Sequence, residues 1–177
     1  MRKNYELKLK LMKETVKIHD KEFELFIKSS EISEMVDRLA LKLTNDLQGK
    51  DVVFIGILNG AFIFAADLIR RIKMDCCCSF VKTASYKGTQ TTGQVETLIG
   101  LCQEVKGRTV VIVEDIIDTG ITLEAVLKEI EDHHPAEIIV VALLFKCEAS
   151  IKDIKIDYLG KEIPDNFLIG YALDYDG

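Results

Sequence analysis

The chain has 177 residues, of which 48% are hydrophobic and 29% charged, a composition typical of one globular domain that buries its own core. Its formal net charge is −6, which argues against binding to a nucleic-acid backbone, because that interaction needs a basic surface. Small anionic ligands stay compatible with this charge, since helix N-termini and metal ions bind them without net positive charge.

The cysteines and the N-terminal residues indicate a cytoplasmic protein. Three of the five cysteines are consecutive, Cys76–Cys78, while Cys102 and Cys147 stand alone, without zinc-ligand spacing. We interpret them as small buried residues in a reducing compartment; a redox or metal role is the alternative. Residues 1–20 are charged throughout, and no apolar run approaches the ~20 residues of a membrane span. We therefore expect a soluble cytoplasmic protein without a membrane partner.

Hydrophobic periodicity predicts an alternation of strands and helices after a strand-rich leader of residues 1–28. In chain order, we expect a strand at 23–27, a helix from Ser30 to about Gly49, a strand at 51–58, a helix at 64–72, strands at 76–85, 95–101 and 108–115, a helix from about Thr119 to Ile130, a strand at 137–145, and two short strands around a Pro-Asp turn in 156–175. The fold class is therefore α/β, with a mainly parallel sheet flanked by helices on both faces.

Unusual polar residues follow three of the predicted strands. The pair Asn59-Gly60 ends one strand, Ser85-Tyr86 follows another, and acids from Asp115 to Asp118 follow a third. Sheets of this class bind ligands at the carboxyl ends of their strands. We therefore expect these three positions to meet at one site.

The acidic position belongs to the stretch VVIVEDIIDTGITLEAV, residues 110–126. If a helix begins near Thr119, the amides and hydroxyls of residues 119–122 form a phosphate cradle; ordinary helix capping is the alternative. Glu114 and Asp115 beside a phosphate would need a divalent metal or sugar hydroxyls between them. Asp118 is placed to act as a general base. The alternative for all three acids is an exposed acidic loop.

The segment VVIVEDIIDTGIT resembles the phosphoribosyl-diphosphate motif of type I phosphoribosyltransferases: an apolar strand, paired acids and a phosphate loop. FIGILNGAFIFAADLIR, ASYKGTQTTG, LLFKCEAS and IPDNFLIGYALDY resemble, in order, segments of hypoxanthine phosphoribosyltransferases. The resemblance covers about Ser30 to Asp176. It implies a single domain over 1–177, with a core over about 30–150 and a small hood formed by about 1–29 and 151–177.

This resemblance implies roles for residues near the phosphates. Leu58, Asn59 and Gly60 match the pyrophosphate loop, which has a cis peptide between its first two residues. Asn59 stands where many relatives have lysine or arginine. Ser85 and Tyr86 match the start of a mobile loop that closes over the site; a solvated hairpin tip is the alternative.

The same resemblance implies roles around the ribose. Glu114 and Asp115 match the pair that holds the ribose hydroxyls, directly or through magnesium. Asp118 matches the catalytic base that takes a proton from the purine and, as part of the ribose and 5′-phosphate site, binds substrate. The 5′-phosphate cradle matches Thr119, Gly120, Ile121 and Thr122.

Four residues nearer the C-terminus match the purine site of the family. Lys146 resembles the lysine that donates to the 6-oxo group, with a surface lysine as the alternative. Phe167 resembles the aromatic that stacks on the base, which by itself would be assigned to the core, and Leu168 matches a backbone contact to the purine edge. Asp174 resembles a magnesium ligand, with a solvated residue as the alternative. The family continues with a tail whose arginine contacts pyrophosphate; either that tail lies beyond Gly177 or the contact is absent.

The resemblance implies an Mg²⁺-dependent enzyme of purine salvage. It would transfer the 5-phosphoribosyl group from phosphoribosyl diphosphate to N9 of hypoxanthine, and also of guanine, giving IMP or GMP and pyrophosphate. One alternative is a regulator that senses phosphoribosyl diphosphate without turnover, although such proteins usually carry a basic surface. Another is a transferase for xanthine or a pyrimidine. The family commonly forms oligomers, so we expect a homodimer or homotetramer.

Overall fold

The computed structural model describes residues 15–85, 95–99 and 103–173, and the chain forms two compact units, residues 1–34 and 35–177. The first unit holds a hairpin of β1 (Thr15–Ile18) and β2 (Lys21–Glu24). The two strands meet in a turn at His19, which has a φ of 53°, and Glu24, the last residue of β2, pairs with Thr15. The strand predicted at 23–27 is therefore wrong in its bounds.

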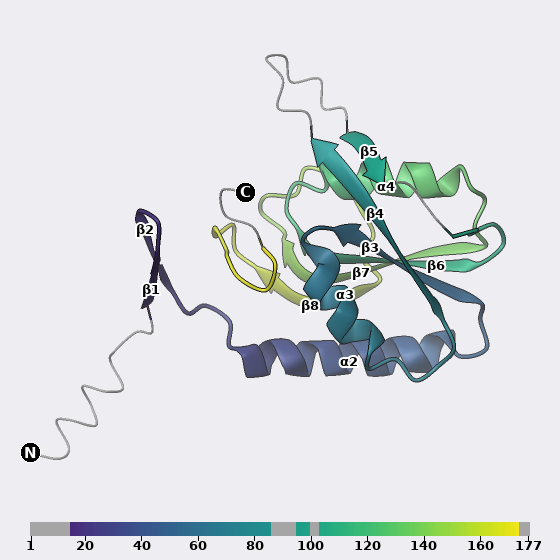
Figure 1. Ribbon diagram of the computed structural model, residues 1–177, viewed down its shortest axis with the longest axis horizontal. Helices are drawn as coiled ribbons and strands as arrows, with labels where there is room; N and C mark the ends of the chain where they lie inside the picture. Colours follow the sequence, from purple (N-terminus) through teal and green to yellow (C-terminus); the bar gives the residue numbers. More distant parts are fainter. Residues whose placement is uncertain (1–14, 86–94, 100–102, 174–177) are drawn as a thin grey trace, which may run out of the picture. The chain divides into compact units, whose positions relative to one another are not determined.

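The second unit is built around a mainly parallel sheet, in which the described strands follow the order β5-β4-β3-β6-β7-β8 (Figure 1). The strands are β3 (Val52–Leu58), β4 (Cys77–Ser85), β5 (Val95–Ile99), β6 (Thr109–Ile117), β7 (Glu137–Lys146) and β8 (Tyr158–Ile163). All neighbours from β4 to β8 pair in parallel, and β5 runs antiparallel to β4. The predicted parallel sheet is confirmed, and the carboxyl ends of its parallel strands lie at one edge.

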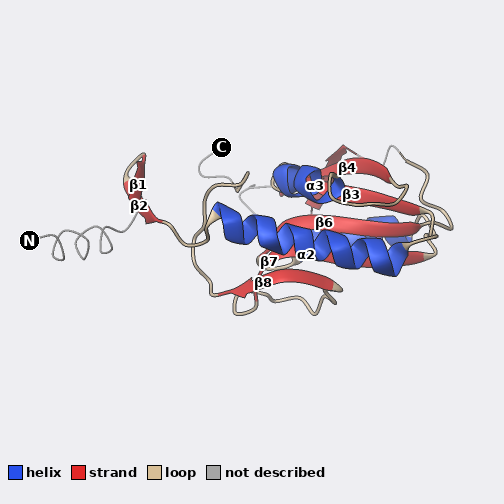
Figure 2. Ribbon diagram, turned by 90° about the horizontal axis from the view of Figure 1, so that it is seen from below, coloured by secondary structure: helices blue, strands red, loops and turns tan. Residues whose placement is uncertain are grey.

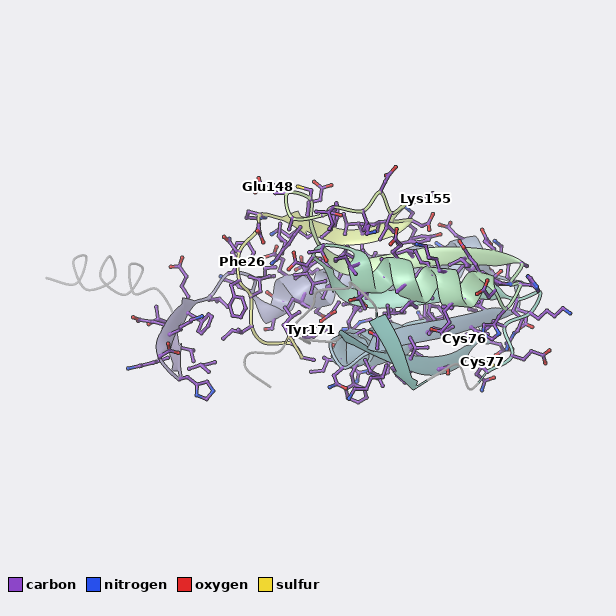
Figure 3. The ribbon with its side chains drawn as sticks, turned by 90° about the horizontal axis from the view of Figure 1, so that it is seen from above. Phe26, Cys76, Cys77, Glu148, Lys155 and Tyr171 are labelled. Atoms are coloured by element: carbon purple, nitrogen blue, oxygen red, sulfur yellow. The ribbon has the colours of Figure 1, made fainter. Side chains whose placement is uncertain are left out.

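Helices cover both faces of this sheet. They are α2 (Ser29–Leu47), α3 (Ala61–Ile69) and α4 (Ile121–Glu131). Figure 2 shows α2 and α3 on one face, and Figure 3, seen from the opposite side, shows α4 in front of the other. From α4, Leu123, Val126 and Ile130 are at most 2% exposed and pack with the apolar side chains of β3 and β6. Each such burial contributes about 1.5–3 kcal/mol, so the core holds the strand ends in place.

The chain after β8 differs from the prediction. Two short strands were expected in 156–175, but after β8 the described residues form only a bridge between Gly170 and Leu173. Tyr171 and Ala172 have φ values of 53° and 71°, in the left-handed region that a strand does not use. The second strand is therefore a wrong prediction.

The described cysteines also differ from the prediction. Cys76 and Cys77 are half-buried, and Cys78 and Cys147 are exposed, so the interpretation as small buried residues is wrong for these four; Cys102 lies outside the described residues. Cys76 and Cys77 lie where β4 begins, at the end of the sheet opposite to Glu148 (Figure 3). Every helix in the described part of the chain is too short or too polar to span a lipid bilayer.

Candidate active site

The carboxyl edge of the sheet gathers most of the predicted site residues that the structure describes. Leu58 ends β3, the acidic residues lie in and just after β6, and Lys146 ends β7. Figure 3 places Glu148, just past β7, and Tyr171 at this end of the strands. Ser85 is the last residue of β4, but its side chain, like Tyr86 and Asp174, lies outside the described residues.

The turn after β3 has the backbone that the resemblance implied. The Leu58–Asn59 peptide bond is cis, which confirms that expectation. The Asn59 carbonyl then accepts a hydrogen bond from the Phe62 amide at 3.1 Å, at the start of α3. Gly60 lies against Asp115: a Cβ atom at Gly60 would come within 2.9 Å of the Asp115 Cγ. The absence of a side chain at Gly60 therefore makes room for one of the site's carboxylates.

Replacing Gly60 by alanine is expected to disturb this contact. Because the Asp115 carboxylate is held on a central strand, the added methyl group must displace it, and overpacking of this kind costs about 1–3 kcal/mol. We expect a lower melting temperature together with weaker binding, in calorimetry, of phosphoribosyl diphosphate, the ligand that the sequence resemblance implies. Gly49→Ala is the control for lost stability: alanine is strained at the Gly49 φ of 82°, but nothing lies within 4 Å of the added methyl group, so this variant should lower the melting temperature without weakening ligand binding. Equal effects of the two variants on binding would contradict the role of the contact.

The paired acids of β6 are buried. Glu114 is 9% and Asp115 7% exposed, and among the described residues the Glu114 Oε2 atom has no hydrogen-bond partner. Burial, with a smaller contribution from the charge of Asp115, holds the pKa of Glu114 well above its usual range. Burial also raises the pKa of Asp115 to about 6, although backbone hydrogen bonds oppose the shift. Two buried carboxylates with an unused oxygen suit a ligand that brings donors or positive charge.

The donor set of these acids fits a divalent cation in part. Carboxylate oxygens are the ligands that Mg²⁺ prefers, and an unpaired buried oxygen is available at Glu114. The described residues contain no cluster of three or more His, Cys, Asp or Glu side chains arranged to hold a metal. The third predicted ligand, Asp174, lies outside them. Glu114 and Asp115 could therefore supply protein oxygens, with the remaining ligands coming from substrate or water.

The predicted phosphate cradle lies between β6 and α4. The helix begins at Ile121 and not at Thr119, because Gly120 has a φ of 81°, a left-handed conformation outside the helical region. The Thr119 hydroxyl accepts a hydrogen bond from the Ile121 amide at 3.4 Å. Thr122 lies in the first turn of α4 and is half-buried. The first amides of α4 therefore begin beside the acids, where an anion would meet the positive end of the helix dipole.

The segment after β7 packs against this turn. The Ile151 amide donates to the Thr119 carbonyl at 3.2 Å, and the Lys152 ammonium lies 2.7 Å from the Glu124 carboxylate in the first turn of α4. A Cβ atom at Gly120 would lie 3.0 Å from the Lys152 Cβ. Contacts between distant parts of the sequence therefore set the shape of the cradle.

Lys146 is buried between two carboxylates. The residue is 7% exposed, and its Nζ atom lies 3.1 Å from both Asp118 Oδ2 and Asp165 Oδ1. Burial lowers the pKa of Lys146, but hydrogen bonds to the two carboxylates outweigh it and raise the pKa overall. Asp165 was not among the predicted site residues. It lies beside Lys146 because Ile163, the last residue of β8, pairs with Lys146 and Asp165 follows two residues later, a contact that no local sequence pattern signals.

The predicted purine residues follow Asp165 in an exposed segment. Phe167 is 58% exposed, which excludes the alternative that it is a core residue, and Leu168 is half-buried. The Tyr171 hydroxyl donates to Asp67 Oδ2 of α3 at 2.7 Å. This bond is the largest cause of the lowered pKa of Asp67. The segment after β8 is thus tied to the helix that starts beside Gly60.

A comparison of the sequence with models of protein families identifies the family of this chain. Residues 28–176, most of the chain, match the model described as the phosphoribosyl transferase domain. The chain belongs to the phosphoribosyltransferase family. The resemblance found in the sequence is therefore confirmed.

Curated members of the phosphoribosyltransferase family are similar over nearly the whole chain. A hypoxanthine-guanine phosphoribosyltransferase of Staphylococcus aureus (strain Mu50 / ATCC 700699) is 36% identical over 159 residues, 89% of this chain and 89% of its own. One of Lactococcus lactis subsp. lactis (strain IL1403) is 40% identical over 86% of this chain and 83% of its own. A hypoxanthine phosphoribosyltransferase of Buchnera aphidicola subsp. Schizaphis graminum (strain Sg) is 38% identical, covering 93% and 90%.

Solved structures of phosphoribosyltransferases share the fold. The crystal structure of a hypoxanthine phosphoribosyltransferase from Staphylococcus aureus superposes with a TM-score of 0.82 at 37% identity, covering 86% of this chain and 83% of that one. The structure of a hypoxanthine phosphoribosyl transferase from Trypanosoma cruzi superposes with a TM-score of 0.81 at 30% identity, covering 91% of this chain and 88% of that one. The predicted α/β class, a mainly parallel sheet flanked by helices, is therefore that of the phosphoribosyltransferases.

Proposed function

We propose that this phosphoribosyltransferase acts in purine salvage, on phosphoribosyl diphosphate and a 6-oxopurine. The observation that carries the substrate class is the Lys146–Asp118 pair, in which a donor and an acceptor lie 3.1 Å apart at the strand ends. A 6-oxopurine presents an acceptor at O6. When its N7 atom carries a proton, N7 is a donor on the same edge. A 6-aminopurine would turn a donor toward the ammonium. Hypoxanthine and guanine therefore fit the pair, and adenine does not.

The proposed reaction exchanges one bond at the ribose anomeric carbon for another. The N9 atom of the purine attacks that carbon, and the bond to pyrophosphate breaks, with its electron pair leaving on the pyrophosphate oxygen. Asp118 takes the proton that the purine ring loses. Positive charge that develops on the ribose is stabilised by the carboxylates of Glu114 and Asp115.

Reactions of this family typically use a divalent metal, and we propose Mg²⁺ at this site. Bound there, the ion would stabilise the charge of the pyrophosphate leaving group. The buried oxygen of Glu114 without a partner supports this assignment, with Asp115 and Asp174 as the other proposed protein ligands.

The remaining predicted residues keep the roles that the resemblance implies, as parts of this proposal. Leu58, Asn59 and Gly60 bind pyrophosphate, and Thr119 to Thr122 bind the 5′-phosphate. Phe167 stacks on the base and Leu168 contacts its edge through the backbone. Ser85 and Tyr86 begin the loop that closes the site, and segments 1–29 and 151–177 form the hood of the single domain. We also propose a cytoplasmic homodimer or homotetramer; the free thiols of the described cysteines suit a reducing compartment.

A turnover assay with five bases tests the proposal. The chain is supplied with Mg²⁺ and phosphoribosyl diphosphate, and hypoxanthine, guanine, xanthine, adenine and uracil are offered separately while nucleotide and pyrophosphate are measured. We expect turnover with hypoxanthine and guanine and none with adenine or uracil. Binding of phosphoribosyl diphosphate without turnover of any base would contradict the enzyme and favour a sensor of the same fold. Turnover of adenine or uracil alone would contradict the substrate class.

A further inference from the structure

Lys146 has a second carboxylate partner that the family resemblance did not assign. Asp165 Oδ1 lies 3.1 Å from the Lys146 ammonium, the same distance as Asp118 Oδ2. The two acids come from different connections: Asp118 follows β6, and Asp165 follows β8. Because β7 lies between these strands, its last residue receives one carboxylate from each side.

The position of Asp165 is set by the sheet and by a tight turn. Ile163 is buried and pairs in parallel with Lys146, so the chain leaves β8 beside the lysine. The Asn166 amide then donates to the Pro164 carbonyl at 2.7 Å, which closes the turn around Asp165. The Asp165 carboxylate is 56% exposed, whereas Lys146 is buried. The acid therefore reaches inward from the solvent edge toward a lysine that cannot move far.

The two ion pairs leave the lysine ready for a ligand. An ammonium has three donors, and the contacts to Asp118 and Asp165 account for two of them. A buried ammonium is stable only when it is paired. If Asp118 turns toward the proton of the purine, as the proposed function requires, the lysine loses one partner. Asp165 is then the carboxylate that keeps Lys146 charged and in place.

We propose that Asp165 is a positioning residue, which holds the Lys146 ammonium for the 6-oxo group of the purine and so leaves Asp118 available as the base. This inference rests on the proposed function. Two residues would then select the base: Lys146 donates to the 6-oxo group, and Asp165 orients Lys146.

The test is a set of Asp165 variants with a matched control. Asp165→Asn removes the charge at constant size, Asp165→Glu restores it, and Asp153→Asn makes the same change at an exposed acid of the preceding segment. Losing a hydrogen bond between charged groups is expected to raise the KM for hypoxanthine about 10-fold to 100-fold. The KM for phosphoribosyl diphosphate should stay within about twofold, Asp165→Glu should recover most of the affinity, and Asp153→Asn should match the wild type.

Two kinetic results would overturn the proposal. If Asp165→Asn and Asp153→Asn give the same KM for hypoxanthine, Asp165 is only a surface charge. If Asp165→Asn raises the KM for hypoxanthine and the KM for phosphoribosyl diphosphate together, the role is structural. The role is also structural if the loss of affinity for hypoxanthine comes with a lower melting temperature and Asp165→Glu does not restore that affinity.

A measurement without turnover separates this proposal from the proposed function. The ammonium signal of Lys146 in ¹⁵N NMR, assigned with Lys146→Gln, should be visible in the wild type because burial and two hydrogen bonds slow its exchange with water. It should broaden or vanish in Asp165→Asn and persist in Asp153→Asn. An unchanged signal in Asp165→Asn would overturn the positioning role. If the wild type turns over none of the five bases while the signal behaves as expected, the proposed function fails and the positioning of Lys146 stands.

Discussion

Asp118→Asn is expected to lower kcat by about 10²–10⁴-fold, the usual contribution of a general base. Asparagine has nearly the same shape and still accepts a hydrogen bond from Lys146, but it cannot take the proton that the purine loses. The carboxylate is 52% exposed, so its removal should change the melting temperature little. Steady-state kinetics with hypoxanthine check the rate, and calorimetry checks that phosphoribosyl diphosphate still binds.

The control for this prediction is again Asp153→Asn, which removes one negative charge at an exposed position of the same unit. It should leave kcat at the wild-type value. A fall in kcat of less than about tenfold in Asp118→Asn would mean that solvent or another group accepts the proton, and the assignment of Asp118 as the base would be wrong.

The buried acids of β6 are expected to make the ligand-free chain less stable as the pH rises. The pKa of Asp115 is raised to about 6 from an ordinary value of 3.8, so between these values the folded state binds more protons than the unfolded state. The free energy of unfolding should therefore fall through this pH window. A shift of roughly two pKa units corresponds to about 3 kcal/mol. Glu114, whose pKa is also raised by burial, acts in the same direction.

Asp115→Asn should remove its part of this dependence. Urea unfolding between pH 4 and pH 8, with EDTA present, compares the variant with the wild type. We expect the variant to gain relative stability from pH 4 to about pH 6 and then to reach a plateau, while its affinity for phosphoribosyl diphosphate falls. Asp153→Asn should give a curve parallel to the wild type. A constant difference between Asp115→Asn and wild type across this pH range would show that the burial of Asp115 carries no electrostatic cost.

The central strands could be predicted from the sequence because their signal is local. β3, β6 and β7 each contain an apolar run, and in β6 and β7 polar residues follow that run within the strand: Glu114 and Asp115 in β6, and Lys146 in β7. A strand buried on both faces needs such an apolar run. The same reasoning placed Asn59-Gly60 and the acids from Asp115 to Asp118 at the carboxyl edge, because parallel strands end together; Lys146 was singled out by the family resemblance. Their roles came from the family resemblance, not from these patterns.

The features that could not be predicted depend on contacts between distant residues or on unusual backbone conformations. Asp165 meets Lys146 only through the register of β7 and β8, which no local pattern contains. The start of α4 was misplaced because an N-terminal pattern does not reveal the left-handed conformation of Gly120. After β8, apolar residues resembled a strand, but the left-handed residue Tyr171 turns the chain away.

The bond between Tyr171 and Asp67 has a consequence for redesign of the protein. The Arg71 guanidinium donates to the Asp67 carbonyl at 2.9 Å and pairs with Asp37 of α2 at 2.5 Å, so a chain of polar contacts runs from Tyr171 through Asp67 and Arg71 to α2. A mutant library aimed at new base preference would normally sample only the pocket. Here the library should include these helix positions, since the Tyr171–Asp67 bond ties the segment that carries Phe167 and Leu168 to α3.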